Sequence, residues 1–197
     1  MTSSLRIAVA DDEAEMLVYF EEILTHLGHK VVSFAKTGQE LIENCRSERP
    51  DLVVTDIKMP DMDGIDATSE LYREGPIAII LVSAYHDPEL IERAEADRIM
   101  AYLIKPIRRE ELQTTIGIAM RRFSEFQALS KEAADLRQAL EDRKLIERAK
   151  GYLMKKGGLD EERAFARLRK LARNKNLKLL HIAQSILTAK EAIEGDS

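Results

Sequence analysis

Short runs of apolar residues recur along the first half of this chain, and segments with a helical spacing of apolar residues separate them. The helical segments include residues 15–27 and 41–46. Continuous apolar runs that alternate with helices are typical of buried strands in a parallel sheet. Connections between such strands are right-handed and cover both faces of the sheet with helices. We therefore predict an α/β fold of the doubly wound (βα)₅ type, with strands at residues 5–10, 30–35, 51–55, 77–82 and 99–104.

The pattern changes after Pro106, because no proline follows it and only five glycines remain. Apolar residues recur there with helical spacing, so we expect this part to be almost entirely helical. The pair Gly157-Gly158 is expected to end one helix, and Asp160 to cap the next. A turn is predicted at residues 174–176. Residues 144–190 are thus predicted to form a small all-α three-helix bundle.

A short heptad pattern precedes the bundle. It consists of Phe126, Leu129, Ala133, Leu136 and Leu140, and Arg143 occupies the next expected apolar position. Such a seam fits a long connecting helix, at residues 123–143, that packs on its own domain. It also fits the seam of a short coiled coil between two copies of the chain. Both interpretations stay open from the sequence.

Composition and charge narrow the class of protein. Apolar residues make up 45% of the chain, charged residues 33%, and Cys45 is the single cysteine, so we expect a cytoplasmic protein without disulfides. Neither a signal peptide nor a membrane span is expected. The net charge of −5 divides into −11 for residues 1–120 and +6 for the remainder. A basic second part is typical of anion binding and also of a solvated helical surface.

Chemically active side chains follow the predicted strands. Asp11 and Asp12 come after the first strand, Asp56 after the third, Ser83 after the fourth and Lys105 after the fifth. Because the carboxyl ends of parallel strands meet at one edge, we expect these side chains to converge. Carboxylates about 4 Å apart repel by roughly 4 kcal/mol per pair at an effective dielectric constant near 20. A hard cation such as Mg²⁺, together with the lysine, would offset this repulsion and leave one carboxylate as a nucleophile toward a phosphoryl donor.

Four separated motifs resemble the receiver domain of response regulators. The resemblance covers residues 5 to 122, and it implies the flavodoxin-like version of the predicted fold. The motifs are Ala10-Asp11-Asp12-Glu13, Thr55-Asp56-Ile57-Lys58-Met59-Pro60-Asp61-Met62-Asp63-Gly64, Ser83-Ala84 and Tyr102-Leu103-Ile104-Lys105-Pro106. One departure is Asp97-Arg98, where receivers commonly have a glycine.

The resemblance also implies roles for the acidic residues. Asp56 would be the phospho-acceptor. Asp12, Asp56 and the backbone carbonyl of Lys58 would be ligands of Mg²⁺, and Asp11 would contribute through water. Asp61, Asp63 and Gly64 are expected only to shape the loop after Asp56.

Three further residues would respond to the phosphoryl group. The Ser83 hydroxyl would hydrogen-bond to one phosphoryl oxygen, and the Lys105 ammonium would pair with another. Tyr102 would swing inward behind Ser83 as a switch, which links the new charge to the face of the fourth helix, fifth strand and fifth helix. The peptide bond between Lys105 and Pro106 is expected to be cis, as in receivers.

The second part of the chain resembles the ANTAR domain, an RNA-binding module of transcription antitermination regulators. The resemblance spans residues 140 to 190, and Arg163 and Arg173 depart from it. It rests on Arg148-Ala149-Lys150-Gly151-Tyr152-Leu153-Met154, on Glu162-Arg163-Ala164-Phe165 through Leu168-Arg169, and on Ile182-Ala183 through Ile186-Leu187.

The charge of this segment agrees with a nucleic-acid surface. Residues 143–178 carry 13 lysines and arginines against 4 acidic residues, a net of +9. Cations of this kind supply affinity for phosphates. Ala149 and Gly151 are small enough to let an RNA loop approach, whereas Tyr152 has no assigned role. The candidate RNA-binding residues are Arg148, Ala149, Lys150, Gly151, Lys155, Arg167, Arg169 and Arg173.

Together the resemblances imply a two-component response regulator that is not an enzyme. It would take a phosphoryl group from a sensor histidine kinase and act as an antiterminator on stem-loops of nascent leader RNA. Two neighbouring hairpins would favour a phosphorylation-dependent homodimer. A DNA-binding regulator and a signalling adaptor whose bundle binds protein remain alternatives. The predicted parts are a receiver at 1–122, a helical linker at 123–143, an ANTAR-like domain at 144–190 and a tail at 191–197.

Overall fold

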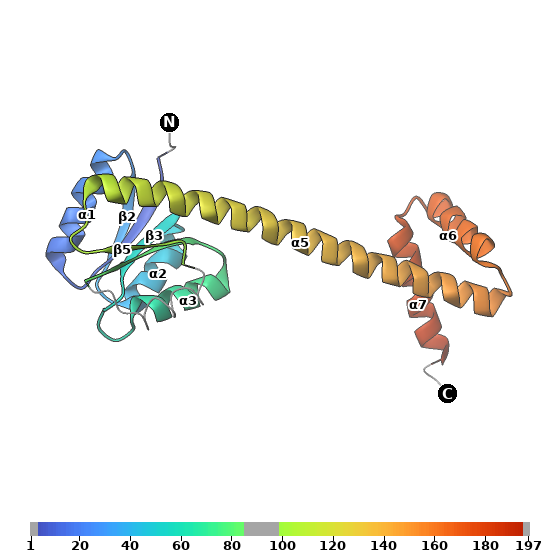
Figure 1. The fold of residues 1–197 in the computed structure, drawn as a ribbon. Coiled ribbons are helices and arrows are strands. Elements are labelled where there is room, and N and C mark those ends of the chain that lie inside the picture. The colour runs from blue at the N-terminus through green and yellow to red at the C-terminus, as the bar shows by residue number, and fades with distance from the viewer. Residues whose placement is uncertain (1–3, 85–98, 195–197) are drawn as a thin grey trace. The chain divides into compact units, whose positions relative to one another are not determined.

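The computed structural model describes residues 4–84 and 99–194. The chain divides into two compact units, Met1–Ala128 and Leu129–Ser197, and each is described by itself (Figure 1). The turn predicted around Asp97-Arg98 and the helix expected between the fourth and fifth strands fall outside the described residues. None of the helices in the described ranges has both the length and the apolar character needed to cross a membrane.

The first unit is built on one five-stranded parallel sheet. Its order is β2-β1-β3-β4-β5, which confirms the predicted flavodoxin-like, doubly wound α/β fold. The interior strands β3 and β4 are buried along their whole length, as expected from their continuous apolar runs. The strands are β1 (Arg6–Ala10), β2 (Lys30–Ala35), β3 (Leu52–Asp56), β4 (Ala78–Ser83) and β5 (Ala101–Ile104).

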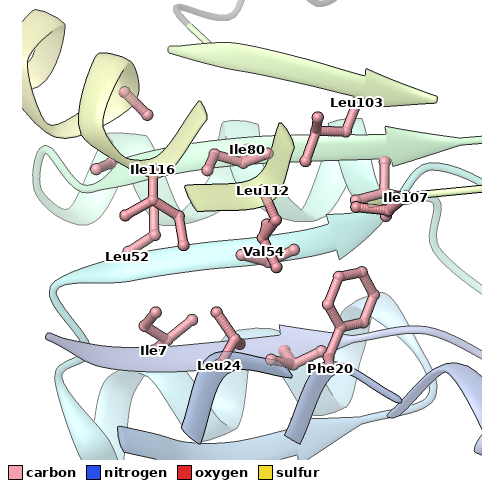
Figure 2. Packing of buried hydrophobic residues seen from close by; sticks show 14 of the residues in the cluster. Ile7, Phe20, Leu24, Leu52, Val54, Ile80, Leu103, Ile107, Leu112 and Ile116 are labelled. Atoms are coloured by element: carbon pink, nitrogen blue, oxygen red, sulfur yellow. The ribbon is translucent and has the colours of Figure 1, made fainter. Parts of the chain in front are cut away.

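Helices cover both faces of this sheet. On one face, α1 (Ala14–His26) and the start of α5 (Arg109–Gly157) pack on the strands. Figure 2 shows this layer, in which side chains of both helices meet those of the strands. On the other face lie α2 (Gly38–Glu48) and α3 (Gly64–Glu74), whose apolar residues form a second core cluster. The core residues labelled in Figure 2 are Ile7, Phe20, Leu24, Leu52, Val54, Ile80, Leu103, Ile107, Leu112 and Ile116.

The helix α5 is continuous over 49 residues. It begins in the first unit, where Ile116, Ala119 and Phe123 are buried, and it ends in the second. Of the predicted heptad residues, Phe126 is half-buried, and its ring centroid lies 6.4 Å from that of Tyr72 on α3. The leucines of the seam are exposed, by 66% for Leu129, 61% for Leu136 and 59% for Leu140.

The second unit consists of the end of α5 with α6 (Glu161–Lys175) and α7 (Leu179–Glu194), the helices expected from the sequence. The α5 helix ends at Gly157, and Gly158 has the positive φ of 58° that favours glycine there. The side chain of Asp160 caps α6 by accepting a hydrogen bond from the Arg163 N–H. The small core of the unit consists of Ala149, Leu168, Ile182, Ala183 and Leu187.

The turn predicted at residues 174–176 begins later than expected. Helix α6 continues through Lys175, and only Asn176 adopts the left-handed conformation, with φ of 52°. The N–H of Leu177 donates to the Ala172 carbonyl oxygen, which satisfies the end of the helix with one left-handed residue. Asn174 and Lys175 can therefore stay helical.

Candidate functional site

The carboxyl edge of the sheet brings together the acids and the lysine that follow its strands. The Lys105 Nζ lies 2.8 Å from Asp11 Oδ2 and 3.5 Å from Asp56 Oδ1. Ser83 ends β4 beside this group and is 3% exposed. The N–H of Lys105 donates to the Ser83 carbonyl oxygen at 2.8 Å, which fixes the end of β5 against β4. The peptide bond after Lys105 is cis, as expected.

Backbone hydrogen bonds hold the two buried carboxylates in place. Asp11 is fully buried, and its Oδ1 accepts a hydrogen bond from the Glu13 N–H at 3.0 Å. The Oδ2 of Asp56 accepts one from the Lys58 N–H at 3.1 Å. The loops after β1 and β3 thus orient these two carboxylates through their own N–H groups. The pocket is therefore built before any ligand arrives.

The electrostatics of the pocket follow from burial. Burial raises the pKa of Asp56 to about 6, the Asp11 charge adds to that rise, and the Lys105 charge opposes it. Burial likewise raises the pKa of Asp11, against the hydrogen bond from Lys105. Burial lowers the pKa of Lys105, but the hydrogen bond to Asp11 and the charge of Asp56 raise it more. The pocket thus holds excess negative charge around one ammonium, which favours a further cation.

Oxygen donors for such a cation lie close together. Within the described part of the chain, ligand atoms of Asp11, Asp12 and Glu13 can be grouped with separations of at most 4.8 Å. Carboxylate oxygens are the donors that hard divalent cations prefer, so these residues suit a divalent metal. The sequence placed Glu13 in the first receiver-like motif but gave it no role. Its Oε1 also lies 3.4 Å from the Lys105 Nζ, so it shares the ammonium with the two aspartates.

Gly64 has a closer relation to Asp56 than the sequence indicated. A Cβ atom at position 64 would lie 2.0 Å from the Asp56 carbonyl oxygen, a distance that no side chain tolerates. The Gly64 N–H donates to the Ile57 carbonyl oxygen at 2.8 Å. Only glycine lets the start of α3 approach the end of β3 this closely. Asp63, as expected, shapes the loop, and it does so by capping α3.

Tyr102 lies on β5 and is half-buried against the cluster that packs beneath α2 and α3. Its partner on the neighbouring strand β4 is Leu81, two residues before Ser83. Its role as a switch stays a prediction.

The candidate RNA-binding residues of the second unit fall into three groups. Arg148, Gly151 and Lys155 are exposed on α5. Ala149 is fully buried in the core of the bundle, and Lys150 is 9% exposed, with its Nζ paired to Glu147 and to Glu161, the latter at 2.8 Å. Neither of these two residues therefore offers a free surface to RNA. The candidates on α6 are Arg167, Arg169 and Arg173, and all three are exposed.

Comparisons with known proteins agree with the division of the chain into two units. A model of the response regulator receiver domain matches residues 7–117, and one of the ANTAR domain matches residues 134–187. The transcriptional regulatory protein PdtaR of Mycobacterium tuberculosis is 39% identical over 92% of this chain and 89% of its own length. The chemotaxis protein CheY of Thermotoga maritima is 34% identical over 51% of this chain and 85% of its own.

Solved structures resemble the first unit. A CheY-like receiver domain protein from Methanospirillum hungatei superposes with a TM-score of 0.58 at 27% identity, covering 62% of this chain and 98% of its own. The response regulator domain of CheB from Thermotoga maritima gives 0.56 at 29% identity, over 60% and 97% of the two chains.

Proposed function

This chain belongs to the response regulators, with a receiver domain followed by an ANTAR domain, and we propose that phosphorylation of Asp56 controls its binding to RNA. The observation that carries the first half of the proposal is the sharing of the Lys105 ammonium between Asp11, Asp56 and Glu13 at 2.8, 3.5 and 3.4 Å. The phosphoryl donor is a histidine kinase, the partner that a receiver domain implies.

In the transfer, a carboxylate oxygen of Asp56 forms a bond to phosphorus. The bond from phosphorus to the donor breaks, and the leaving group takes the electron pair and a proton from solvent. The Lys58 N–H holds Oδ2 of the carboxylate, and the Lys105 ammonium stands 3.5 Å from Oδ1, where it stabilises charge on the phosphoryl oxygens. The nucleophile is the ionised carboxylate, so the Lys105 charge, which lowers the burial-raised pKa of Asp56, favours the transfer.

The divalent cation of this step would be Mg²⁺. Asp12, Asp56 and the Lys58 carbonyl would hold it, and Asp11 would contribute through water. When bound, the ion neutralises charge on the carboxylates and the phosphoryl oxygens. After transfer, the Ser83 hydroxyl bonds a phosphoryl oxygen and Tyr102 moves inward behind it. These two side chains link the new charge to the surface of the receiver.

Phosphorylation is tested by mass spectrometry of the full chain after incubation with a small phosphoramidate and Mg²⁺. The wild type gains the mass of one phosphoryl group, which is stable in acid and lost in alkali. Asp56→Asn gains none. Asp63→Asn is the matched control, because it changes a neighbouring acid in the same loop, the one that caps α3. Labelling of Asp56→Asn equal to wild type would refute Asp56 as the acceptor.

The output half of the proposal is antitermination through RNA stem-loops of a leader transcript. It is supported by the ANTAR match over residues 134–187 and by the net charge of +9 over residues 143–178. The exposed seam at Leu129, Leu136 and Leu140 supports pairing of two copies on phosphorylation, which would place two bundles on two neighbouring hairpins.

The output is tested by salt-dependent binding to an RNA hairpin, to the matching RNA duplex and to the matching DNA duplex. We expect the hairpin to bind most tightly, and more tightly after beryllofluoride mimics phosphorylation. Preference for the DNA duplex would instead identify a DNA-binding regulator. The absence of salt-sensitive affinity for any of them would favour an adaptor that binds protein.

A further inference from the structure

A cleft of about 520 Å³ opens in the second unit between the last turns of α5 and the end of α7. Four of its lining residues are cationic and none is acidic. This volume lies in the range of small-ligand sites. The lining consists of Arg148, Gly151, Tyr152, Lys155, Lys156, Leu187 and Lys190.

The charge of this cleft contrasts with that of a neighbouring one. The other cleft, of about 480 Å³, is lined by Glu147, Lys150, Glu161, Glu162 and Phe165, and so carries three acids and one lysine. A concave surface lined by charges of one sign concentrates its field. An anionic ligand of this unit is therefore drawn to the cleft between α5 and α7.

Tyr152 gives this cleft an aromatic wall. It is half-buried, yet it is not one of the apolar residues that form the core of the bundle. The Lys190 ammonium lies 5.8 Å from the centroid of its ring. An aromatic ring flanked by cations is the arrangement on which unpaired bases stack while their phosphates are neutralised.

Gly151 leaves open space on the same wall. It lies inside α5, where glycine destabilises a helix relative to alanine, and a Cβ atom there would meet nothing within 4 Å. Gly117 of the same helix is equally open, so the missing side chain alone identifies no site. Of the two glycines, Gly151 alone lines the cationic cleft, where the missing side chain lets a ligand approach the helix backbone.

We propose that this cleft receives one unpaired nucleotide of the RNA, with the base stacked on Tyr152 beside Gly151 and its phosphates on Arg148, Lys155 and Lys190. This inference rests on the proposed RNA-binding function and assigns the recognition of loop bases to one cleft. The candidates on α6, Arg167, Arg169 and Arg173, do not line it and serve only as phosphate contacts. Lys190 lies beyond residues 134–187, so the family match alone does not point to it.

The test measures affinity of the full-length protein for two probes, an RNA hairpin with a fixed stem and a randomised loop, and a duplex of the same stem. Tyr152→Ala is expected to lose roughly tenfold in affinity for the hairpin and little for the duplex, because stacking needs an unpaired base. Tyr152→Phe retains the ring and should bind like the wild type. Gly151→Ala should lose hairpin affinity, whereas Gly117→Ala, the matched control in the same helix, should not.

Charge variants separate stacking from phosphate contacts. Lys190→Gln is expected to weaken binding to both probes and to reduce the salt dependence of binding by about one phosphate contact. Lys131→Gln, an exposed lysine earlier on α5, is its control and should change neither. Far-UV circular dichroism establishes that each variant keeps its helices.

The failures are distinguishable. If the wild type binds the hairpin but Tyr152→Ala and Gly151→Ala bind it equally well, the cleft is not the base site and the RNA-binding function stands. If the wild type binds no hairpin, with or without the beryllofluoride mimic, both the function and the cleft assignment fall. An acidic protein segment would then be the occupant to pursue.

Discussion

Replacing Asp56 by asparagine is expected to stabilise the receiver unit at neutral pH when no divalent cation is present. Burial raises the pKa of Asp56 from 3.8 to about 6, so the folded state binds this proton more tightly than the unfolded state. The folded wild type has the full stability that this proton confers below about pH 4, and it loses that stability as the pH rises through about 6. A shift of two pKa units corresponds to about 3 kcal/mol in the free energy of unfolding.

The asparagine side chain stays neutral, so its free energy of unfolding lacks this pH dependence. Relative to the wild type, the variant should gain about 3 kcal/mol between pH 4 and pH 8. Lys105 keeps its 2.8 Å partner Asp11 in the variant and loses only the longer contact to Asp56. The difference between the two proteins therefore reports mainly on the desolvated carboxylate.

Urea unfolding in a chelator, at pH values between 4 and 8, measures this difference. Deuterium labelling of the β3 peptide during the titration reads the receiver separately from the helical unit. Mg²⁺ at ten times its dissociation constant should restore about 1.4 kcal/mol to the wild type alone at pH 8. A gap between the proteins that stays constant over this pH range, or an asparagine variant that is less stable at pH 8, would refute the argument.

Three other substitutions have definite expected outcomes. Gly64→Ala should destabilise the receiver by about 3 kcal/mol and impair phosphorylation, because the new Cβ would meet the Asp56 carbonyl oxygen at 2.0 Å; thermal unfolding and labelling measure both effects. Lys105→Gln should slow phosphoryl transfer by roughly 100-fold or more in stopped-flow assays, because the ammonium beside Asp56 Oδ1 is lost. Leu136→Glu, at an exposed seam position, should leave the monomer as stable as before and abolish the dimer in light scattering with beryllofluoride.

Each of these has a control in the chain. Gly75→Ala adds a Cβ where nothing lies within 4 Å, so it should be tolerated. Lys36→Gln removes an exposed ammonium just after β2 and should leave the transfer rate unchanged. Gln138→Glu adds a charge off the seam of the same helix. If it disrupted the dimer as strongly as Leu136→Glu, pairing would not run through the leucines.

The convergence of Asp11, Asp56 and Lys105 could be predicted because it depends only on strand order and direction. Parallel strands end at one edge whatever the loops do, so sequence position sufficed. The reach of Glu13 to Lys105 depends on the conformation of one side chain after β1, for which the sequence carried no signal. The close approach of Gly64 to Asp56 depends likewise on the path of a loop.

The RNA-facing residues were harder to predict because the motif crosses both sides of a helix. Leu145, Ala149 and Leu153 are four residues apart, which puts Ala149 on the core side, and this spacing was available in the sequence. The burial of Lys150 could not be read from the sequence, because its partner Glu161 comes from the next helix. Tyr152 had no assignable role until its place in a cationic cleft was known.

The continuity of α5 limits where the polypeptide can be severed. Its early turns supply Ile116 and Phe123 to one core, and its late turns supply Ala149 to the other. Removing the early or the late turns of α5 would expose the apolar core residues that they cover, and the remaining fragment would tend to aggregate. A break in the chain is tolerated only in the exposed middle turns, roughly between Leu129 and Leu140. A gene fusion that exchanges the output domain must therefore join helix to helix within these turns.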